Sequence, residues 1–142
     1  MPLFNQDLEK QPSEKTKEFK AKIKATDAIL IATPEYNYSI PGVLKNAIDW
    51  ASRPYGDNAF DGKPVAIMSA SIGMLGAARA QYHLRQCLVF LNMYPINKPE
   101  IMVSFAPEKF DENGRLKDEN TKQHIAKLLE SLVEWTKKLQ KK

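Results

Sequence analysis

Consecutive hydrophobic positions mark the strands that this sequence predicts. Residues 28–33 are almost entirely apolar, which is typical of a short strand buried on both faces, as in a parallel sheet. Residues 64–69 predict a second such strand, and residues 99–103 predict a third, weaker one. Helical periodicity occupies the remaining long segments, over residues 13–25, 41–52, 77–92 and 118–140. Strands that alternate with helices through short links predict an α/β fold, with a parallel sheet and helices on both of its faces.

The apolar side of each predicted helix identifies the residues that should face the core. Phe19 and Ile23 anchor the first helix at i, i+4 spacing. For the helix over 41–52 we expect Ser39 as the N-cap and Pro41 in the first turn. The inward positions of the later helices are Val43, Leu44, Ala47, Ile48 and Ala51, then Leu84, Cys87, Leu88 and Leu91, and finally Ile125, Leu128, Leu129, Leu132, Val133 and Trp135. Cys87, the single cysteine, is therefore interpreted as a core residue and not as a nucleophile. The turn-rich residues 53–63 and the polar residues 106–117 are predicted to be connections, the latter an exposed loop.

Length and charge narrow the function classes. The 142 residues are sufficient for one domain with a core. The net charge of +4 equals the contribution of Lys137, Lys138, Lys141 and Lys142, at the C-terminal end. No aromatic residues interleave with these lysines, so the sequence does not favour a nucleic-acid interface. The sequence contains no apolar stretch of ~18 residues and no signal peptide, so we expect no membrane partner and a cytoplasmic protein.

The loop Glu35-Tyr36-Asn37-Tyr38 lies between the end of a predicted strand and the start of a predicted helix. In open α/β sheets ligands bind in the crevice outside the carboxyl ends of the strands. A planar, amphipathic ligand requires an aromatic or apolar wall and a few backbone groups that fix its edge, and this loop can supply both. The alternative interpretation is an ordinary β–α connection whose tyrosines are partly buried surface residues.

The run Thr-Pro-Glu-Tyr-Asn-Tyr-Ser-Ile-Pro-Gly-Val-Leu-Lys-Asn-Ala-Ile-Asp-Trp, residues 33–50, resembles the central signature of the NAD(P)H-dependent FMN reductases. That family has a flavodoxin-like, doubly wound parallel sheet and includes chromate, quinone and azo-dye reductases. In the family this loop packs against the isoalloxazine ring. The resemblance therefore implies cofactor-binding roles for Pro34, Glu35, Tyr36 and Asn37, with Glu35 contributing through its backbone.

Residues 69–79 also follow a predicted strand and resemble the second flavin loop of the same reductases. The resemblance implicates Ser71, Gly73 and Gly76. The family often has two adjacent glycines before its Ala-Arg pair, whereas this chain has Gly76-Ala77, which narrows the space where a ligand or a second subunit approaches the backbone.

Two further residues near the second loop prompt expectations. At the start of a helix, the cation of Arg79 is unfavourable unless an anion compensates it, and we expect a ligand phosphate or a carboxylate of another subunit. The other interpretation of Arg79 is an exposed, solvated side chain. His83 is interpreted as a structural or subunit-contact residue and not as a catalytic one.

The resemblance implies an enzyme that passes a hydride from NADPH or NADH to bound FMN, and electrons onward to a small-molecule acceptor: a quinone, dye, metal oxyanion or free flavin. It also implies a homodimer or homotetramer. No catalytic side chain and no metal site are expected, because the cofactor carries the chemistry. One alternative is a flavodoxin-like chain that binds flavin poorly and serves as a non-enzymatic subunit or partner. Another is a one-electron carrier, which the net basic charge disfavours.

The resemblance covers nearly all of residues 1–142 but corresponds to the C-terminal three-quarters of the family domain. The family opens with a strand and a Ser-rich loop that holds the flavin phosphate, and this sequence has no counterpart of either. The expectation is a single flavodoxin-like domain, N-terminally truncated, with residues 28–33 at a sheet edge that is free to pair with a second copy or to aggregate. Only ring contacts from residues 34–37 and 71–76 would then hold FMN, so weak binding is expected.

Overall fold

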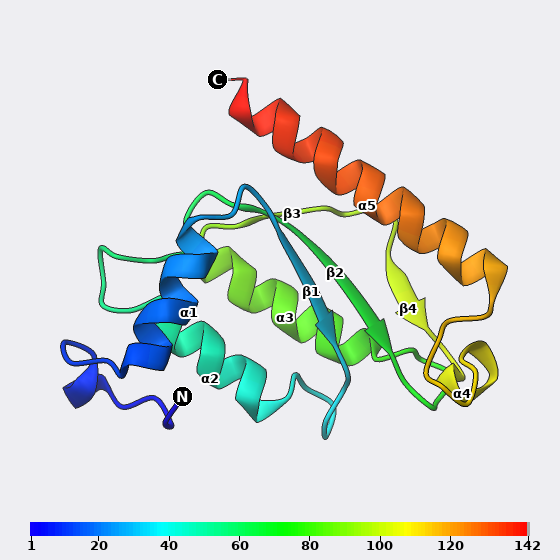
Figure 1. Cartoon of the computed structure of the whole chain (residues 1–142), viewed down its shortest axis with the longest axis horizontal. Helices are drawn as coiled ribbons and strands as arrows, with labels where there is room; N and C mark the ends of the chain where they lie inside the picture. The colour runs from blue at the N-terminus through cyan, green and yellow to red at the C-terminus, as the bar shows by residue number, and fades with distance from the viewer. Residues whose placement is uncertain (142) are drawn as a thin grey trace.

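A parallel sheet flanked by helices forms the centre of the computed structural model, which describes residues 1–141 (Figure 1). Lys142, the last lysine of the predicted basic C-terminal end, lies outside the described residues. The elements in chain order are η1 (Gln6–Leu8), α1 (Glu14–Lys24), β1 (Ile29–Thr33), α2 (Gly42–Ala51), β2 (Pro64–Ala70), α3 (Ala78–Phe90), β3 (Tyr94–Pro95), β4 (Ile101–Val103), α4 (Ala106–Lys109) and α5 (Glu119–Gln140).

β2 is the central strand. It pairs with β1 on one side, from Ile29 opposite Val65 to Thr33 opposite Ser69. On its other side β3 pairs with the start of β2, and β4 pairs with its end, where Met68–Ala70 lie opposite Ile101–Val103. All of these pairs are parallel, so the carboxyl ends of β1, β2 and β4 point to one edge of the sheet, as the arrowheads in Figure 1 show.

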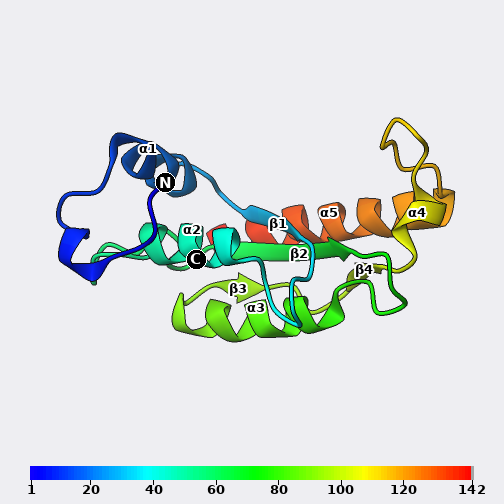
Figure 2. The same ribbon diagram turned by 90° about the horizontal axis from the view of Figure 1, so that it is seen from below.

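The side chains of β2 alternate between two core layers. Val65 and Ile67 belong to the layer formed with α2 and α3, where Leu84 and Leu88 are fully buried. Ala66 and the partly buried Met68 belong to the layer formed with α5, and Figure 2 shows α3 and α5 on opposite faces of the sheet. This arrangement confirms the predicted doubly wound α/β fold. Cys87 packs partly buried against the first layer, in agreement with its interpretation as a core residue.

The expected burial of β1 on both faces is wrong. Its residues alternate between intermediate and exposed positions until Thr33, and Leu30 is 38% exposed. The physical reason is the position of β1 in the sheet: among the described strands it pairs only with β2 and therefore forms an edge, as expected for residues 28–33. The apolar run thus predicted a strand of a parallel sheet correctly, but it did not predict how deeply that strand is buried.

Four local predictions also need correction. Ser39 does not cap α2, because Pro41 is the N-cap residue and makes no side-chain cap bond. Val43 is 79% exposed, so the buried side of α2 consists of Ile48, Trp50 and Ala51. The segment over 106–117 is not a simple loop, since it contains α4 and a bridge between Phe110 and Leu116. On α5, Leu129 and Val133 lie at 41% and 52% exposure.

Candidate functional site

Two loops meet at the carboxyl edge of the sheet. The first loop, residues 34–41, follows β1, and the second loop, residues 71–77, follows β2 and leads into α3. The predicted site residues divide between them: Pro34, Glu35, Tyr36 and Asn37 lie on the first loop, and Ser71, Gly73 and Gly76 on the second. Figure 2 shows both loops on the α3 side of the sheet.

The first loop contains a tight turn over Tyr36–Ser39. The amide of Tyr36 donates to the Ser39 carbonyl over 2.9 Å, and the amide of Ser39 donates back to the Tyr36 carbonyl over 3.0 Å. Asn37 and Tyr38 have φ values of 49° and 66°, as the two central residues of a type I′ turn require. The turn holds two aromatic rings in solvent, since Tyr36 is 60% and Tyr38 70% exposed.

Glu35 connects the two loops. One carboxylate oxygen accepts the Ala80 amide in the first turn of α3 over 3.1 Å, and the other lies 3.4 Å from the Arg79 guanidinium. Only 13% of the Glu35 side chain is exposed. A carboxylate at a helix N-terminus satisfies a free amide and is stabilised by the helix dipole. The side chain of Glu35 is therefore engaged in joining the loops, in addition to any role of its backbone.

Arg79 and His83 both turn toward the first loop from α3. The Arg79 guanidinium lies 4.0 Å from the centre of the Tyr38 ring, a cation–π distance. His83 Nδ1 and the Ser39 hydroxyl are 2.7 Å apart. Within the chain, the anion next to Arg79 is Glu35. The expected contact with a ligand phosphate or a partner carboxylate stays a prediction. His83 has the structural contact that we expected, and the Ser39 hydroxyl is used there and not as a helix cap.

The second loop is attached to β4 and to the residues that follow it. The Ser71 amide donates to Val103 over 3.0 Å, and the amides of Phe105 and Ala106 donate to Gly73 and Ser71 over 3.2 and 2.9 Å. Within residues 1–141, the amides of Ile72, Gly73 and Met74 have no acceptor. No side chain among these three residues can donate to or accept from a ligand in place of the amides, since Ile72 and Met74 are apolar. Ile72 and Met74 are 81% and 68% exposed. Free amides beside exposed apolar side chains are suited to the edge and face of a flat heteroaromatic ligand.

Gly76 and Ala77 form the junction with α3. Gly76 has φ +56°, and a Cβ there would lie 2.5 Å from the Met102 carbonyl carbon, so only glycine fits between the second loop and β4. Ala77 is buried and has φ 67°, also in the left-handed region, where L-residues are disfavoured. Ala77 stands where the family often has its second glycine, and the positive φ of this position would suit glycine. By contrast, Gly73 has open space around it and no positive φ.

The residues present fit a flavin ring. Aromatic and apolar side chains stand exposed on both loops, and unpaired amides lie next to them. The sequence analysis included Tyr38, Ile72 and Met74 in its two loops without assigning them individual roles. It did not include Phe105, which is 47% exposed and follows β4. A signal was available, because apolar side chains in short loops after strands have no core to enter. Among the described residues, no cluster of three or more His, Cys, Asp or Glu side chains could hold a metal, and no helix is long and apolar enough to cross a membrane.

Comparisons with known proteins find one family of reductases. A family model described as "NADPH-dependent FMN reductase" matches residues 1–108. An NAD(P)H-dependent FMN reductase of Pseudomonas aeruginosa is 53% identical over 140 residues, which are 98% of this chain and 75% of the relative. A 2-hydroxy-1,4-benzoquinone reductase of a Burkholderia species is 40% identical over 137 residues, 96% of this chain and 75% of the relative.

A solved structure has the same fold. The flavoenzyme NAD(P)H:(acceptor) oxidoreductase from Paracoccus denitrificans superposes with a TM-score of 0.88 at 38% identity, over 97% of this chain and 76% of that chain. The sheet with helices on both faces is thus the flavodoxin-like fold of this structure. Named reductases at these identities favour an enzyme over the non-enzymatic subunit that the sequence left open.

Proposed function

The chain belongs to the NADPH-dependent FMN reductase family, and we propose that it takes electrons from NAD(P)H through bound FMN and passes them to a quinone. The observation that carries the proposal is the pairing of the two loops at the carboxyl edge of the sheet, through the contacts of Glu35 with Arg79 and Ala80. This edge is where open α/β sheets bind their ligands.

In this proposal the flavin ring lies against both loops. FMN, when bound, supplies the redox chemistry by accepting a hydride from NAD(P)H and returning two electrons to the acceptor. Pro34, Tyr36 and Asn37 provide the wall and edge on the first loop, and Ser71, Gly73 and Gly76 the backbone on the second. Tyr36 has the exposed ring face that stacking needs, and the free amide of Gly73 can donate to a ring oxygen or nitrogen.

Glu35 is not assigned a proton-transfer role. Its carboxylate already accepts a hydrogen bond from the α3 amide of Ala80 and faces the Arg79 guanidinium. Both carboxylate oxygens are thus used to join the two loops. The residues of the site therefore bind and orient, and they leave the chemistry to the cofactor.

A quinone is the acceptor that the exposed side chains favour. Ile72, Met74 and Phe105 surround the second loop with apolar surface, which suits a planar, weakly polar acceptor better than a hydrated metal oxyanion. The Burkholderia relative is named for reduction of a benzoquinone, which supports the same choice.

The assembly proposed for the chain is a homodimer or homotetramer. Large apolar side chains stand exposed along α2 and α3, and Val43, Val89 and Phe90 are each more than 70% exposed. These exposed apolar side chains support contact with a second copy of the chain. Because NAD(P)H is the reductant, we further propose a cytoplasmic location. Light scattering coupled to size exclusion tests the oligomer, and cell fractionation tests the location.

Flavin binding and turnover test the function directly. The purified protein is titrated into FMN and, separately, riboflavin, with quenching of flavin fluorescence as the signal. NADPH and NADH oxidation is then followed with 1,4-benzoquinone. We expect saturable quenching and FMN-dependent, quinone-dependent oxidation of the nicotinamide. Flavin-loaded protein that oxidises neither nicotinamide would contradict the proposal.

A further inference from the structure

Gln81 is a fully buried polar residue. It lies outside the signature of residues 33–50 and is not one of the loop residues proposed to contact the flavin. It lies on α3, one turn after the second loop ends, and faces the sheet. Its amide nitrogen donates to the Ser69 hydroxyl over 2.8 Å and to the Ile101 carbonyl over 2.7 Å. Since a carbonyl can only accept, the contact with Ile101 fixes which side of the Gln81 amide is the nitrogen.

The Ser69 hydroxyl continues this chain of hydrogen bonds. Having accepted from Gln81, it donates to the Gly76 carbonyl over 2.5 Å. Ser69 is itself buried, at 4% exposure, in β2 opposite Met102 of β4. The relay therefore joins four separate parts of the chain: α3, β2, β4 and the end of the second loop.

We infer that Gln81 and Ser69 are positioning residues for the second loop, and that they set how tightly this loop binds the flavin ring. The inference rests on the proposed function. The loop is held at its start by the Ser71 amide and at its end by this relay. Between them the carbonyls of Gly73 and Met74 accept from Phe105 and Ser104, while the amides of residues 72–74 stay free of any acceptor among the described residues. Amides held at both ends of a short segment are preorganised for a ligand, which lowers the entropy lost on binding.

A second observation supports a role beyond packing. The Gln81 side-chain oxygen is buried and has no hydrogen-bond partner among the described residues. An apolar side chain of similar shape would avoid the cost of this unpaired acceptor. The amide nitrogen is thus the functional part of the side chain, because its two donors bind the Ser69 hydroxyl of β2 and the Ile101 carbonyl of β4, the strands that frame the site.

The test compares Gln81→Met, Ser69→Ala and their double variant with Gln86→Met, an exposed glutamine on the same helix. Each variant is titrated with FMN and riboflavin, and its unfolding curve gives the fraction that is folded under the assay conditions. We expect Gln81→Met and Ser69→Ala each to weaken the binding of both flavins by about tenfold, which corresponds to the loss of roughly one well-placed hydrogen bond. The double variant should be no weaker than the worse single variant, because both interrupt one relay. Gln86→Met should bind as the unaltered protein does.

Hydrogen exchange without flavin supplies a readout that does not depend on the loaded enzyme. Faster exchange at residues 72–76 in Gln81→Met and Ser69→Ala, with α5 unchanged, is the expected result. Flavin affinities within twofold of the unaltered protein, in variants that remain folded, would overturn the inference while the proposed function stands. Absence of flavin binding by the unaltered protein would instead overturn the proposed function, and this inference with it. Ser69→Ala keeps the test decisive if Gln81→Met does not fold, since Ser69→Ala removes only one oxygen.

Discussion

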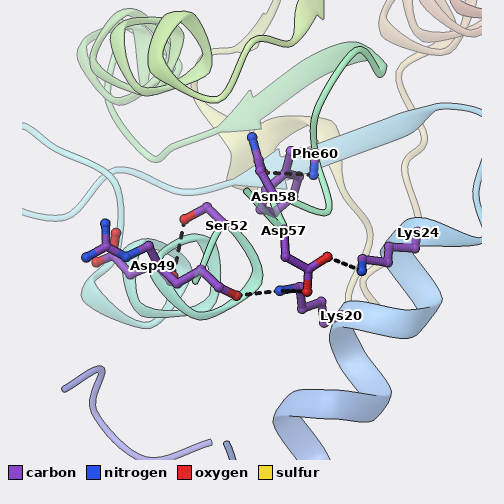
Figure 3. A network of polar contacts seen from close by, with 8 residues as sticks. Lys20, Lys24, Asp49, Ser52, Asp57, Asn58 and Phe60 are labelled. Atoms are coloured by element: carbon purple, nitrogen blue, oxygen red, sulfur yellow. Dashed lines mark hydrogen bonds and ion pairs between the residues drawn. The ribbon is translucent and has the colours of Figure 1, made fainter. Parts of the chain in front are cut away.

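The carboxyl edge of the sheet and the corner where α1 meets residues 53–57 use polar groups in opposite ways. We call the latter the α1 corner, defined by Lys20, Lys24, Arg53 and Asp57. There Lys20 bonds the Arg53 carbonyl and the Asp57 carboxylate, and Lys24 bonds the other oxygen of Asp57 (Figure 3). Hydrogen bonds from Lys20 and then Lys24 hold the pKa of Asp57 below its usual value.

At the carboxyl edge, by contrast, hydrogen-bond donors and apolar side chains have no partner within the described residues. Tyr36, Ile72 and Met74 present apolar surface to solvent, and amides of the second loop have no acceptor within residues 1–141. At the α1 corner each cation contacts an anion of the chain, because Lys20 and Lys24 share Asp57 and Arg53 pairs with Glu9. That region therefore holds α1 to the rest of the fold. The contrast teaches that exposed apolar surface with unpaired amides, and not charge density, is the basis of the proposed site.

The largest expected effect separates the two glycines of the second loop. Gly76→Ala places a Cβ 2.5 Å from the Met102 carbonyl carbon at φ +56°. The alanine would be strained in the left-handed region and would also clash with backbone atoms of β4. We therefore expect a loss of about 2–4 kcal/mol in the free energy of unfolding. Urea denaturation measures it. Gly73→Ala is the matched control, since nothing lies within 4 Å of its Cβ, and should change stability by less than about 0.5 kcal/mol. Equal stability of the two variants would show that the second loop is not fixed against β4.

The next effect concerns the ring wall of the first loop. The variant Tyr36→Ala/Asn37→Gly removes the exposed ring and the amide side chain while glycine keeps the positive φ of position 37. We expect flavin binding to weaken by about 1–3 kcal/mol, from a lost aromatic contact and its positioning. The losses should be equal for FMN and riboflavin, because residues 36 and 37 are assigned to the ring and not to the phosphate.

Tyr55→Ala is the control for that variant. Tyr55 is 70% exposed and lies beside the α1 corner, where Arg53 stacks on its ring at 3.9 Å. Its loss should leave flavin affinity unchanged. A weaker flavin complex in Tyr55→Ala than in the first-loop variant would reverse the assignment of the two regions.

A smaller effect is expected from the connection between the loops. Glu35→Ala removes the acceptor of the Ala80 amide and the partner of Arg79. Loss of a capping side chain costs about 1 kcal/mol of stability, which chemical denaturation measures. Glu130→Ala, which removes an exposed carboxylate of α5, is the control and should have almost no effect. If Glu35→Ala is as harmless as its control, the two loops are not joined through this carboxylate.

The smallest effect belongs to the α1 corner. Asp57→Asn removes both ion pairs, but 49% of the side chain is exposed, so solvent screening limits the loss to about 0.5 kcal/mol. Because the folded-state pKa of Asp57 is lowered, its stabilisation is complete above the ordinary value of 3.8 and disappears as pH falls through the folded-state value. The difference between Asp57→Asn and the unaltered protein should therefore shrink below about pH 4. A difference that grows as the pH falls would contradict this assignment, as would any change in flavin affinity.

Sequence patterns predicted the elements well where burial is continuous. β2 and α3 lie within two residues of their predicted bounds, because Val65, Ile67, Leu84 and Leu88 all enter one core layer. The patterns failed where a choice depends on distant partners. Ser39 had two possible uses, a helix cap or a bond to His83, and only the packing of α3 beside the first loop decides between them.

The site shows the same limit. A resemblance in sequence selected both loops, and their position at the ends of parallel strands followed from the α/β pattern. It could not find the carboxylate contacts of Glu35 or the buried relay from Gln81 to Gly76, because residues 35 and 80, and 69 and 81, are brought together by tertiary structure alone. The edge position of β1 was expected, yet its solvent exposure was not, since an apolar run does not report how many neighbours a strand has.

Amide hydrogen exchange with and without saturating FMN tests the contrast between the two regions most directly. Bound flavin should slow exchange at residues 72–74 of the second loop, whose amides gain acceptors. It should also slow exchange at residues 35–38 of the first loop, which the flavin ring covers. Amides at residues 53–57 in the α1 corner should exchange at the same rate in both states. Protection confined to the α1 corner, or the absence of protection on both loops in a protein shown to bind FMN, would contradict the assignment of the flavin to the carboxyl edge of the sheet.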